Sequence, residues 1–222
     1  MNLGQIIAQA RIELDDTEPD YLWSDAELTF YANEAEEEAA RRSRLLIDAS
    51  TAAICTITLV SGQSEYSLDG RVIGLRSAQP SWRSKALSFE TVAAMDEDCP
   101  GWQARTGAPQ SVVADYETGV LKLCPTPTAA DAGETVQLRV TRLPLEPLVD
   151  AADTPEIKAV YHRKLIHWIK HKAYLKPDAD TLNKDASATA LAFFEQEFGP
   201  AKSAWSDEFD ARNMPYGVDG VY

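Results

Sequence analysis

Two stretches near the start of the chain carry apolar side chains at the three- and four-residue intervals of an amphipathic helix. The first runs from Leu3 to Leu14 and ends at an acidic turn that contains a proline. The second opens at Ser24-Asp25-Ala26-Glu27, a capping box whose hydroxyl and carboxylate each accept an N–H group left free at a helix start. Its apolar stripe continues to Leu46. The pattern therefore predicts two helices within the first fifty residues.

A period of two replaces the helical period near residue 53. Cys55, Ile57 and Leu59 alternate with Thr56 and Thr58, which is the pattern of a half-buried strand. Further strands are predicted at 64–68, 71–77, 111–116, 120–124 and 135–142, with a short helix at 88–95 and a loop at 96–109. The strands at 111–116 and 120–124 are expected to form a hairpin around Glu117-Thr118-Gly119. A β-region is therefore expected from about residue 52 to residue 148.

Helical spacing returns after Thr154-Pro155-Glu156, where threonine suits the N-cap and proline suits the first helical position. This third helix is predicted to end at Pro177, and a fourth to span 180–198 before Gly199-Pro200. Residues 201–211 are assigned to one further helical segment. Residues 213–222 have no periodicity, so an extended tail is expected there.

Helices at both ends and strands between them predict the α+β class, with a helical bundle formed by both termini and an inserted mainly-β domain. The expected limits are 1–51 together with 153–211 for the bundle, 52–150 for the inserted β-domain and 212–222 for the C-terminal tail. Three domains in series are less favoured, because fifty residues forming two helices would bury little core by themselves.

Charge and composition then argue against a nucleic-acid-binding, membrane-spanning or secreted protein. The chain holds 21 Lys and Arg against 35 Asp and Glu, a net charge of −14, which disfavours general binding to the phosphate backbone of nucleic acids. No apolar run reaches the length of a membrane span, and the first residues lack the pattern of a secretory signal, so a cytosolic origin is expected. Three cysteines without metal-ligand spacing are predicted to be reduced and buried.

All three histidines lie in the third predicted helix. His167 and His171 are four residues apart, as in zinc-binding pairs, but Trp168 stands where the HExxH motif needs glutamate, and no third ligand is evident. The acidic run Asp96-Glu97-Asp98 is typical of a solvated face. No catalytic, metal or cofactor-binding residue is therefore assigned. A metal-dependent hydrolase using His167 and His171 stays the alternative from the enzyme class.

The third helix is strongly basic, with six cations against one anion over residues 156–176, whereas residues 1–50 hold four cations and twelve anions. Such a stripe can bind nucleic acid, or it can pair with an acidic surface of the same or a neighbouring subunit. The second interpretation is favoured, since complementary patches set the register between subunits. The candidate subunit-interface charges are Glu37, Glu38, Arg41, Arg42, Lys164, Lys170 and Lys172. Of these, Glu38 and Arg42 are four residues apart on one predicted helix, where opposite charges can pair.

The C-terminal segment carries large apolar side chains in a stretch too short to build a core. Docking onto a partner explains them best, because aromatic residues dominate the binding energy of interfaces. The candidate docking residues are Trp205, Phe209, Met214, Pro215, Tyr216 and Tyr222.

Several strings of this sequence resemble one family. Leu22-Trp23-Ser24-Asp25-Ala26-Glu27-Leu28, then Tyr31-Ala32-Asn33-Glu34-Ala35 and Glu38-Ala39-Ala40-Arg41-Arg42, resemble the opening of head-to-tail adaptor (connector) proteins of tailed bacteriophages. Gly62-Gln63-Ser64-Glu65-Tyr66-Ser67-Leu68 and Arg71-Val72-Ile73 look like the β-region of that family. The segment 78–109 is longer than the family pattern implies.

The resemblance implies a structural protein of the virion neck, made in the host cytoplasm, that does no chemistry and needs no cofactor. Such adaptors form rings, usually of twelve subunits, beneath the portal vertex, where they extend the DNA channel and give the tail a docking platform. The implied partners are further copies of the chain, the portal protein, and a tail or nozzle protein. DNA passes through the channel without specific binding, and no membrane is involved. The C-terminal docking residues would then contact the portal.

Overall fold

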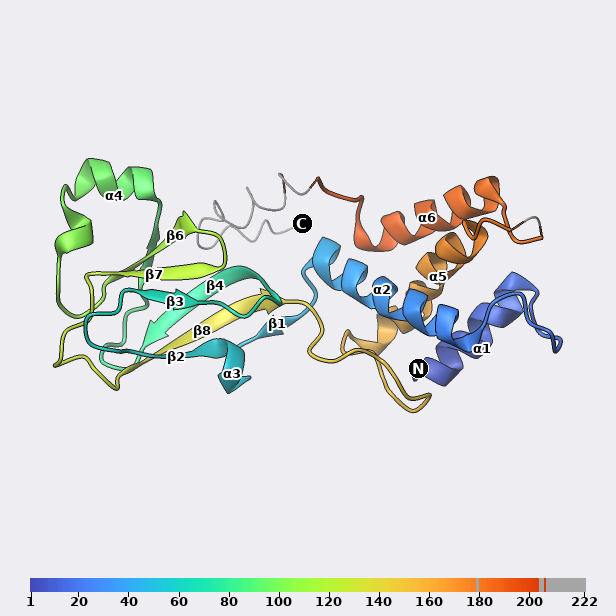
Figure 1. Cartoon of the computed structure of the whole chain (residues 1–222), viewed down its shortest axis with the longest axis horizontal. Helices are drawn as coiled ribbons and strands as arrows, with labels where there is room; N and C mark the ends of the chain where they lie inside the picture. The colour runs from blue at the N-terminus through green and yellow to red at the C-terminus, as the bar shows by residue number, and fades with distance from the viewer. Residues whose placement is uncertain (179, 204–205, 207–222) are drawn as a thin grey trace. The chain divides into compact units, whose positions relative to one another are not determined.

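The computed structural model describes residues 1–178, 180–203 and 206 (Figure 1). The chain forms two compact units. The helical unit comprises Met1–Leu46 and Leu143–Lys202, and the β unit comprises Ile47–Arg142. Helices lie at both ends of the sequence and strands in the middle, so the predicted α+β class is confirmed.

The helical unit contains α1 (Leu3–Leu14), α2 (Asp25–Ser43), the 3₁₀ helix η2 (Ala159–Lys164), α5 (Leu165–Tyr174) and α6 (Lys184–Phe198). The predicted capping box at the start of α2 is confirmed, because Ser24 accepts the Glu27 N–H and Glu27 accepts the Ser24 N–H. Asn2 and Gln5 form a second box at α1. The prediction that α2 reaches Leu46 is wrong, since Arg44 adopts a left-handed conformation and ends the helix.

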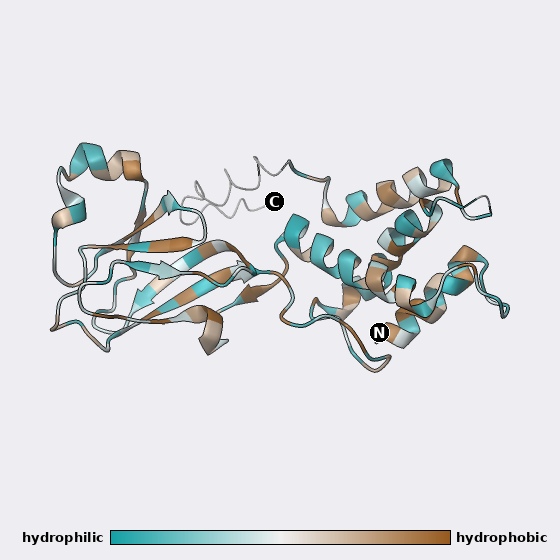
Figure 2. Ribbon diagram, viewed as in Figure 1, coloured by the Kyte–Doolittle hydropathy of each residue, from teal (hydrophilic) through white to brown (hydrophobic). Residues whose placement is uncertain are grey.

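One hydrophobic core joins the two ends of the chain in the helical unit. Leu28 of α2 and Ile169 of α5 are both fully buried in it, and Trp168 packs against it from the edge. The ribbon of α2 is largely teal in Figure 2, since only a narrow stripe of that helix is apolar and the rest carries charge. Neither terminal segment therefore supplies this core alone. The other buried members include Leu3, Ile6, Ala10, Leu14, Trp23, Ala32, Ala35, Ala39, Leu165, Ile166, Ala173, Phe194 and Phe198.

The β unit contains two four-stranded sheets. In the first, β8 (Thr135–Arg142) pairs antiparallel with β1 (Ile47–Asp48), β2 (Thr56–Thr58) and β4 (Val72–Pro80). The second has the order β3 (Glu65–Ser67), β7 (Val120–Cys124), β6 (Ser111–Glu117) and β5 (Ser88–Glu90). Three short helices complete the unit: α3 (Ala52–Cys55), α4 (Val92–Asp98) and the 3₁₀ helix η1 (Trp102–Ala104).

The strand predicted from about residue 53 begins only at Thr56, because Ala52–Cys55 forms the short helix α3, but the buried and exposed sides of the alternation are predicted correctly. Cys55, Ile57 and Leu59 are buried, whereas Thr58 is exposed. The predicted hairpin between β6 and β7 is also confirmed, and Gly119 in its turn has a φ of 74°, a left-handed conformation that suits glycine. All three cysteines are free thiols. Cys55 and Cys124 are buried as predicted, but Cys99 is only half-buried.

Other boundaries differ from prediction for identifiable reasons. The helix predicted at 88–95 begins later than predicted, because Ser88–Glu90 pairs in parallel with β6. Residues 92–95 are helical and belong to α4, which begins after Thr91, the residue that caps it by accepting the Ala94 N–H. The predicted loop at 96–109 contains the end of α4 and all of η1.

The third predicted helix does not begin at Pro155. The backbone N–H groups of Glu156 and Ile157 donate to Glu36 Oε1 at 2.5 and 3.3 Å, so a side chain of α2 takes the place of a first helical turn. Helical structure starts at η2 instead. The fourth helix starts at Lys184, where Asn183 is the N-cap, rather than at residue 180. Residues 201–203 are not helical, and most of the further segment predicted at 201–211 lies outside the described residues.

Candidate functional site

Four of the five lysines in residues 156–176, the basic segment, pair with acids of the same helical unit. Lys170 Nζ lies 3.2 Å from Glu13 of α1, and Lys172 Nζ lies 3.2 Å from Glu34 of α2. Lys164 pairs with Glu197 of α6. The structure therefore pairs these predicted cations with acids of their own chain. This is one of the two pairings expected for the basic stripe, which were with acids of the same subunit or of a neighbouring one. Their role between subunits stays a prediction.

A fourth pair joins Lys176 to the capping box of α2. Lys176 Nζ lies 2.9 Å from Glu27 Oε1. Hydrogen bonds from Lys176 and from the Ser24 backbone lower the pKa of Glu27 to about 2, and the same pairing raises the pKa of Lys176. The carboxylate that caps α2 thus also fixes the end of the basic segment.

The predicted charges on α2 divide into exposed and inward-facing groups. Glu38 bonds Arg42 at 2.7 Å, as its four-residue spacing predicted, and bonds Arg41 at 3.0 Å. The Arg42 side chain is only 4% exposed; its guanidinium lies 5.1 Å from the Trp168 ring and 3.6 Å from Glu195 of α6. Arg42 therefore packs α2 against α5 and α6. Glu37 is exposed.

Each histidine has a packing or hydrogen-bond partner inside the helical unit. His167 stacks on Phe193 with ring centroids 5.4 Å apart, and His171 Nδ1 lies 2.8 Å from Ser187 Oγ. Burial lowers the pKa of both. Buried His162 bonds the Ile157 carbonyl through Nε2. Within residues 1–178, 180–203 and 206, no group of three or more His, Cys, Asp or Glu side chains is placed to hold a metal ion.

The loop between α1 and α2 is organised by Arg11, a residue that sequence reasoning missed. Its buried guanidinium donates to Asp16 at 2.6 Å, to the Trp23 carbonyl at 2.9 Å and to Asp25 at 2.6 Å, and it lies 3.8 Å from the centre of the Tyr21 ring. The available signal was a single arginine on the apolar side of α1, followed by an acid-rich loop. This network holds the loop in one conformation.

In the β unit, the segment that the family resemblance left unassigned builds a small core of its own. Met95 and Trp102 pack there against Val113 and Cys124. Trp102 Nε1 donates to Asp96 at 2.8 Å, so Asp96 orients a buried indole instead of belonging to a fully solvated face.

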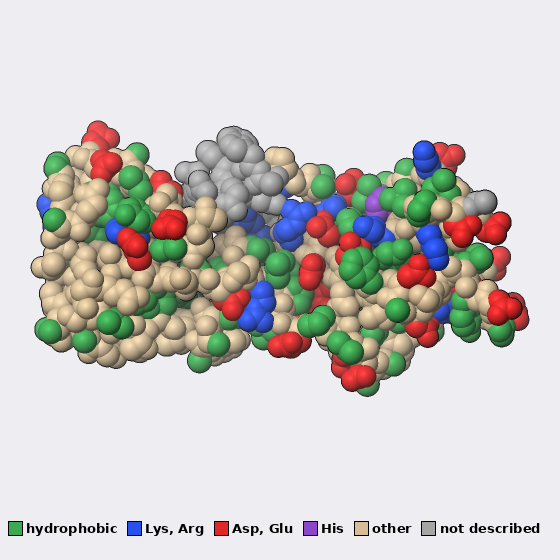
Figure 3. Space-filling model, viewed as in Figure 1, with side chains coloured by type: hydrophobic (Ala, Val, Ile, Leu, Met, Phe, Trp, Pro, Cys, Tyr) green, Lys and Arg blue, Asp and Glu red, His purple; other side chains and the backbone are tan. Residues whose placement is uncertain are grey.

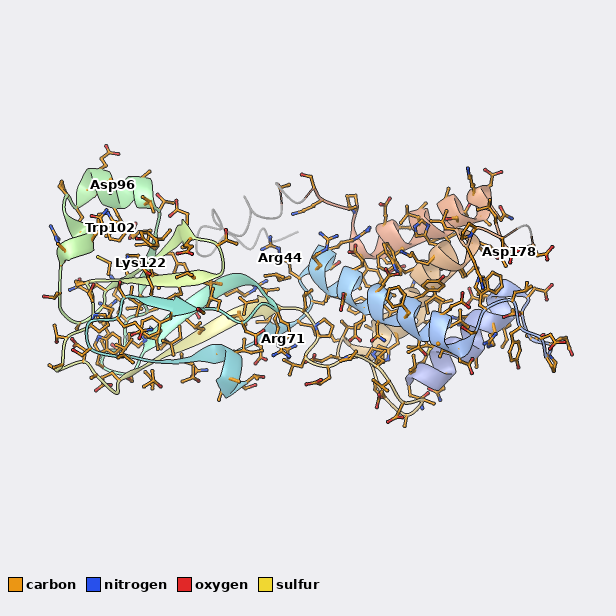
Figure 4. The ribbon with its side chains drawn as sticks, in the orientation of Figure 1. Arg44, Arg71, Asp96, Trp102, Lys122 and Asp178 are labelled. Carbon is orange, nitrogen blue, oxygen red and sulfur yellow. The ribbon has the colours of Figure 1, made fainter. Side chains whose placement is uncertain are left out.

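Lys122 completes this cluster, and Figure 4 shows it near Asp96 and Trp102. Its Nζ lies 2.7 Å from Glu65 and 4.0 Å from the centre of the Tyr116 ring. These contacts, with a further hydrogen bond of 3.4 Å from Lys122 Nζ to Ser64 Oγ, bind the strands of the second sheet together. The geometry is that of a packed structural element.

The arrangement is thus a structural one: a bundle tied by ion pairs and a β insertion with its own cores. Comparison with known families agrees and assigns the chain to the adaptor proteins that join phage heads to tails. The family profile described as SU10 adaptor protein matches residues 1–217, and the chain belongs to that family. The resemblance drawn from the sequence is confirmed. No curated protein matches the chain.

In the described part of the chain, no helix is both long and apolar enough to cross a membrane. The candidate docking residues Trp205, Phe209, Met214, Pro215, Tyr216 and Tyr222 lie outside the described residues.

Proposed function

We propose that the protein is a structural virion component that forms a ring under the portal, extends the DNA channel and docks the tail. The observation that carries the proposal is the family match over residues 1–217, which spans both units of the structure and not one motif alone. The ring is expected to hold about twelve subunits. A closed ring forms when one surface of each subunit binds a different surface of the next subunit.

The charges of the chain suit a channel wall that does not bind DNA. The net charge of −14 repels phosphates at the distances over which such fields act. Four of the five lysines in residues 156–176 that could have attracted DNA are paired with Glu13, Glu34, Glu27 and Glu197. DNA therefore passes without specific contacts, and the nucleic-acid-binding interpretation has less support than the adaptor.

The portal is proposed to be the partner of the C-terminal segment, and a tail or nozzle protein the partner of the opposite face of the ring. The large apolar side chains of residues 205–222 support this assignment, since they include three aromatic rings beyond Trp205. Anchors of this kind bury much area for each ordered residue. The metal-dependent hydrolase has no comparable support, because His167 and His171 are each packed against other side chains.

The test uses purified DNA-filled heads that carry the portal but have no neck. Addition of the protein should place extra ring-shaped density below the portal in electron micrographs and should make the heads competent to accept tails. Heads without a portal are the matched control and should bind nothing. Failure of the protein to bind portal-bearing heads, or equal binding to heads without a portal, would overturn the proposed function.

A further inference from the structure

An exposed basic and apolar corner lies at the start of η2. Lys158 and Arg163 are exposed, and Val160 between them is 72% exposed, the highest value among the large apolar side chains of the described chain. Val160 and Arg163 are three residues apart and therefore lie above one another on a 3₁₀ helix. Neither cation forms an ion pair with any other described residue. We call Lys158, Val160 and Arg163 the basic corner.

The loop between α1 and α2 has the complementary character. Asp15, Glu18 and Asp20 are exposed and form no ion pair within the described residues, and Tyr21 and Leu22 beside them are 48% and 43% exposed. We call residues 15–22 the acidic loop. Red side chains gather in Figure 3 at the end of the helical unit where Figure 1 draws this loop.

The acidic loop is pre-organised although its apolar side chains face solvent. Arg11 bonds Asp16 and stacks on Tyr21, and the Leu22 N–H donates to Asp16 at 2.8 Å. A loop that is fixed before binding loses little conformational entropy when a partner arrives. Exposed Tyr21 and Leu22 on such a loop are therefore suited to a contact surface.

The basic corner and the acidic loop lie at opposite ends of the helical unit. His162 of η2 lies 2.9 Å from the Met1 amino group, beside the first residues of α1, whereas the acidic loop follows the last residue of the same helix. Twelve helical residues span about 18 Å. Helix α5 gives the same direction, because it begins at η2 and its Ala173 carbonyl accepts the Trp23 indole N–H next to the loop.

We propose that the basic corner of one subunit binds the acidic loop of the next copy of this chain. This inference rests on the proposed ring and names the contact that closes it. Two unlike surfaces at opposite ends of one unit cannot meet within a single copy, but they can join successive copies head to tail, which is the contact that generates a ring. Opposite charges around an apolar centre of Val160, Tyr21 and Leu22 set the register of that contact.

The experiment reverses the charge of each surface in turn. One variant carries Lys158→Glu with Arg163→Glu, and the other carries Thr17→Lys, Glu18→Lys and Asp20→Asn, which leaves Asp15 against two new lysines. All five positions are exposed, and asparagine tolerates the left-handed backbone at residue 20, so both variants should fold as judged by circular dichroism. Assembly is measured by sedimentation of the free protein and by the number of copies bound to each portal-bearing head, at about 0.15 M salt. Each variant alone should assemble at least tenfold more weakly than the unchanged protein.

The decisive sample is an equal mixture of the two variants. An acidic corner can then bind a basic loop, and a basic corner an acidic loop, so alternating rings should form with the copy number of the unchanged protein. The control is Lys85→Glu with Arg105→Glu, two exposed cations of the β unit, which changes the net charge equally and should leave assembly unaffected.

Three results would overturn the inference: assembly of either variant alone at the level of the unchanged protein, failure of the mixture to restore assembly, or equal loss in the control. In each case binding of the unchanged protein to portal-bearing heads would leave the proposed function standing. If the unchanged protein neither assembles nor binds heads, the proposed function fails and the contact fails with it.

Discussion

Arg142 Nε donates a hydrogen bond to Asp48 Oδ2 over 2.7 Å, and both side chains are more than nine-tenths buried. The pair joins the last residue of β8 to the last residue of β1 in the β unit. Burial disfavours the charged form of Asp48, but hydrogen bonds from Thr51, Ser50 and Arg142 outweigh it and hold the pKa of Asp48 well below its usual range. Asp48 is thus ionised across the physiological pH range.

Replacing Asp48 with Asn should destabilise the β unit by about 3–5 kcal/mol, because the buried guanidinium of Arg142 would lose the carboxylate of its 2.7 Å ion pair. Hydrogen exchange of the β8 amides measures the change. The matched control is Asp69→Asn, which breaks a partly exposed pair with Arg71 and should cost less than about 1 kcal/mol. Equal costs for the two changes would show that burial does not set the strength of the Asp48 pair.

The helical unit should lose stability in acid through Glu27. Because the pKa of Glu27 is about 2 in the folded chain against an ordinary 4.5, its contribution is complete above about pH 4.5 and is lost as the pH falls toward 2. The contribution is about 1 kcal/mol or less, since the pair with Lys176 is partly exposed. The free energy of unfolding of Glu27→Gln, which keeps the capping hydrogen bonds, should therefore fall below that of the unchanged protein at pH 6 and equal it near pH 2.

Glu36 should show the opposite pH dependence. Burial raises its pKa, outweighing hydrogen bonds from Glu156 and Ile157, so its charged form weakens the fold as the pH rises above the ordinary pKa of a glutamate. Glu36→Gln keeps an acceptor oxygen and should melt at a temperature equal to or above that of the unchanged protein at pH 7. Glu36→Ala leaves two N–H groups without an acceptor and should cost about 1–3 kcal/mol.

The shared core predicts that the two ends of the chain unfold together. Leu28→Asp or Ile169→Asp places an unpaired charge in that core and should each cost several kcal/mol, enough to unfold the whole helical unit. Far-ultraviolet circular dichroism measures the loss. Residues 47–142 expressed alone should still fold, and residues 1–50 alone should not. A cooperative, fully helical melt of the 1–50 fragment would contradict this organisation.

Deletion of residues 212–222 should abolish attachment to portal-bearing heads while leaving the melting temperature within about 1 °C, because the core residues that the structure describes all lie before Gly199. Attachment is measured by co-sedimentation with heads. Replacement of the same residues by a Gly/Ser segment of equal length controls for chain length and should behave as the deletion does. Attachment at unchanged stoichiometry would move the docking role to another surface.

Local signals predicted most of the elements. The capping box at Ser24, the alternation from Cys55 to Leu59 and the strand at 135–142 depend on neighbouring residues, so they can be read from the sequence. The predicted i,i+4 pair of Glu38 with Arg42 has the same origin.

The errors and omissions come from partners far apart in the sequence. Glu36 takes the N–H groups that a helix starting at Pro155 would have used, and parallel pairing with β6 converts residues 88–90 into a strand. The role of Arg11 depends on contacts with Asp25 and Tyr21, which lie after the end of α1 and so outside the helical pattern that contains Arg11. No periodicity of α1 reports such contacts, so only the folded chain shows that the acidic loop is held rigid.

The register of β1 on β8 has a consequence for how such a chain can diversify. Ile47 pairs with Thr141 and Asp48 with Val140, so the chain enters and leaves the β unit through adjacent strands. The two ends of the 96-residue insertion (47–142) therefore lie close together. The helical unit requires only this short distance between them, and not a particular structure in the residues between. Exchange of the inserted module among members of this family therefore changes the surface of the β unit without rebuilding the helical core.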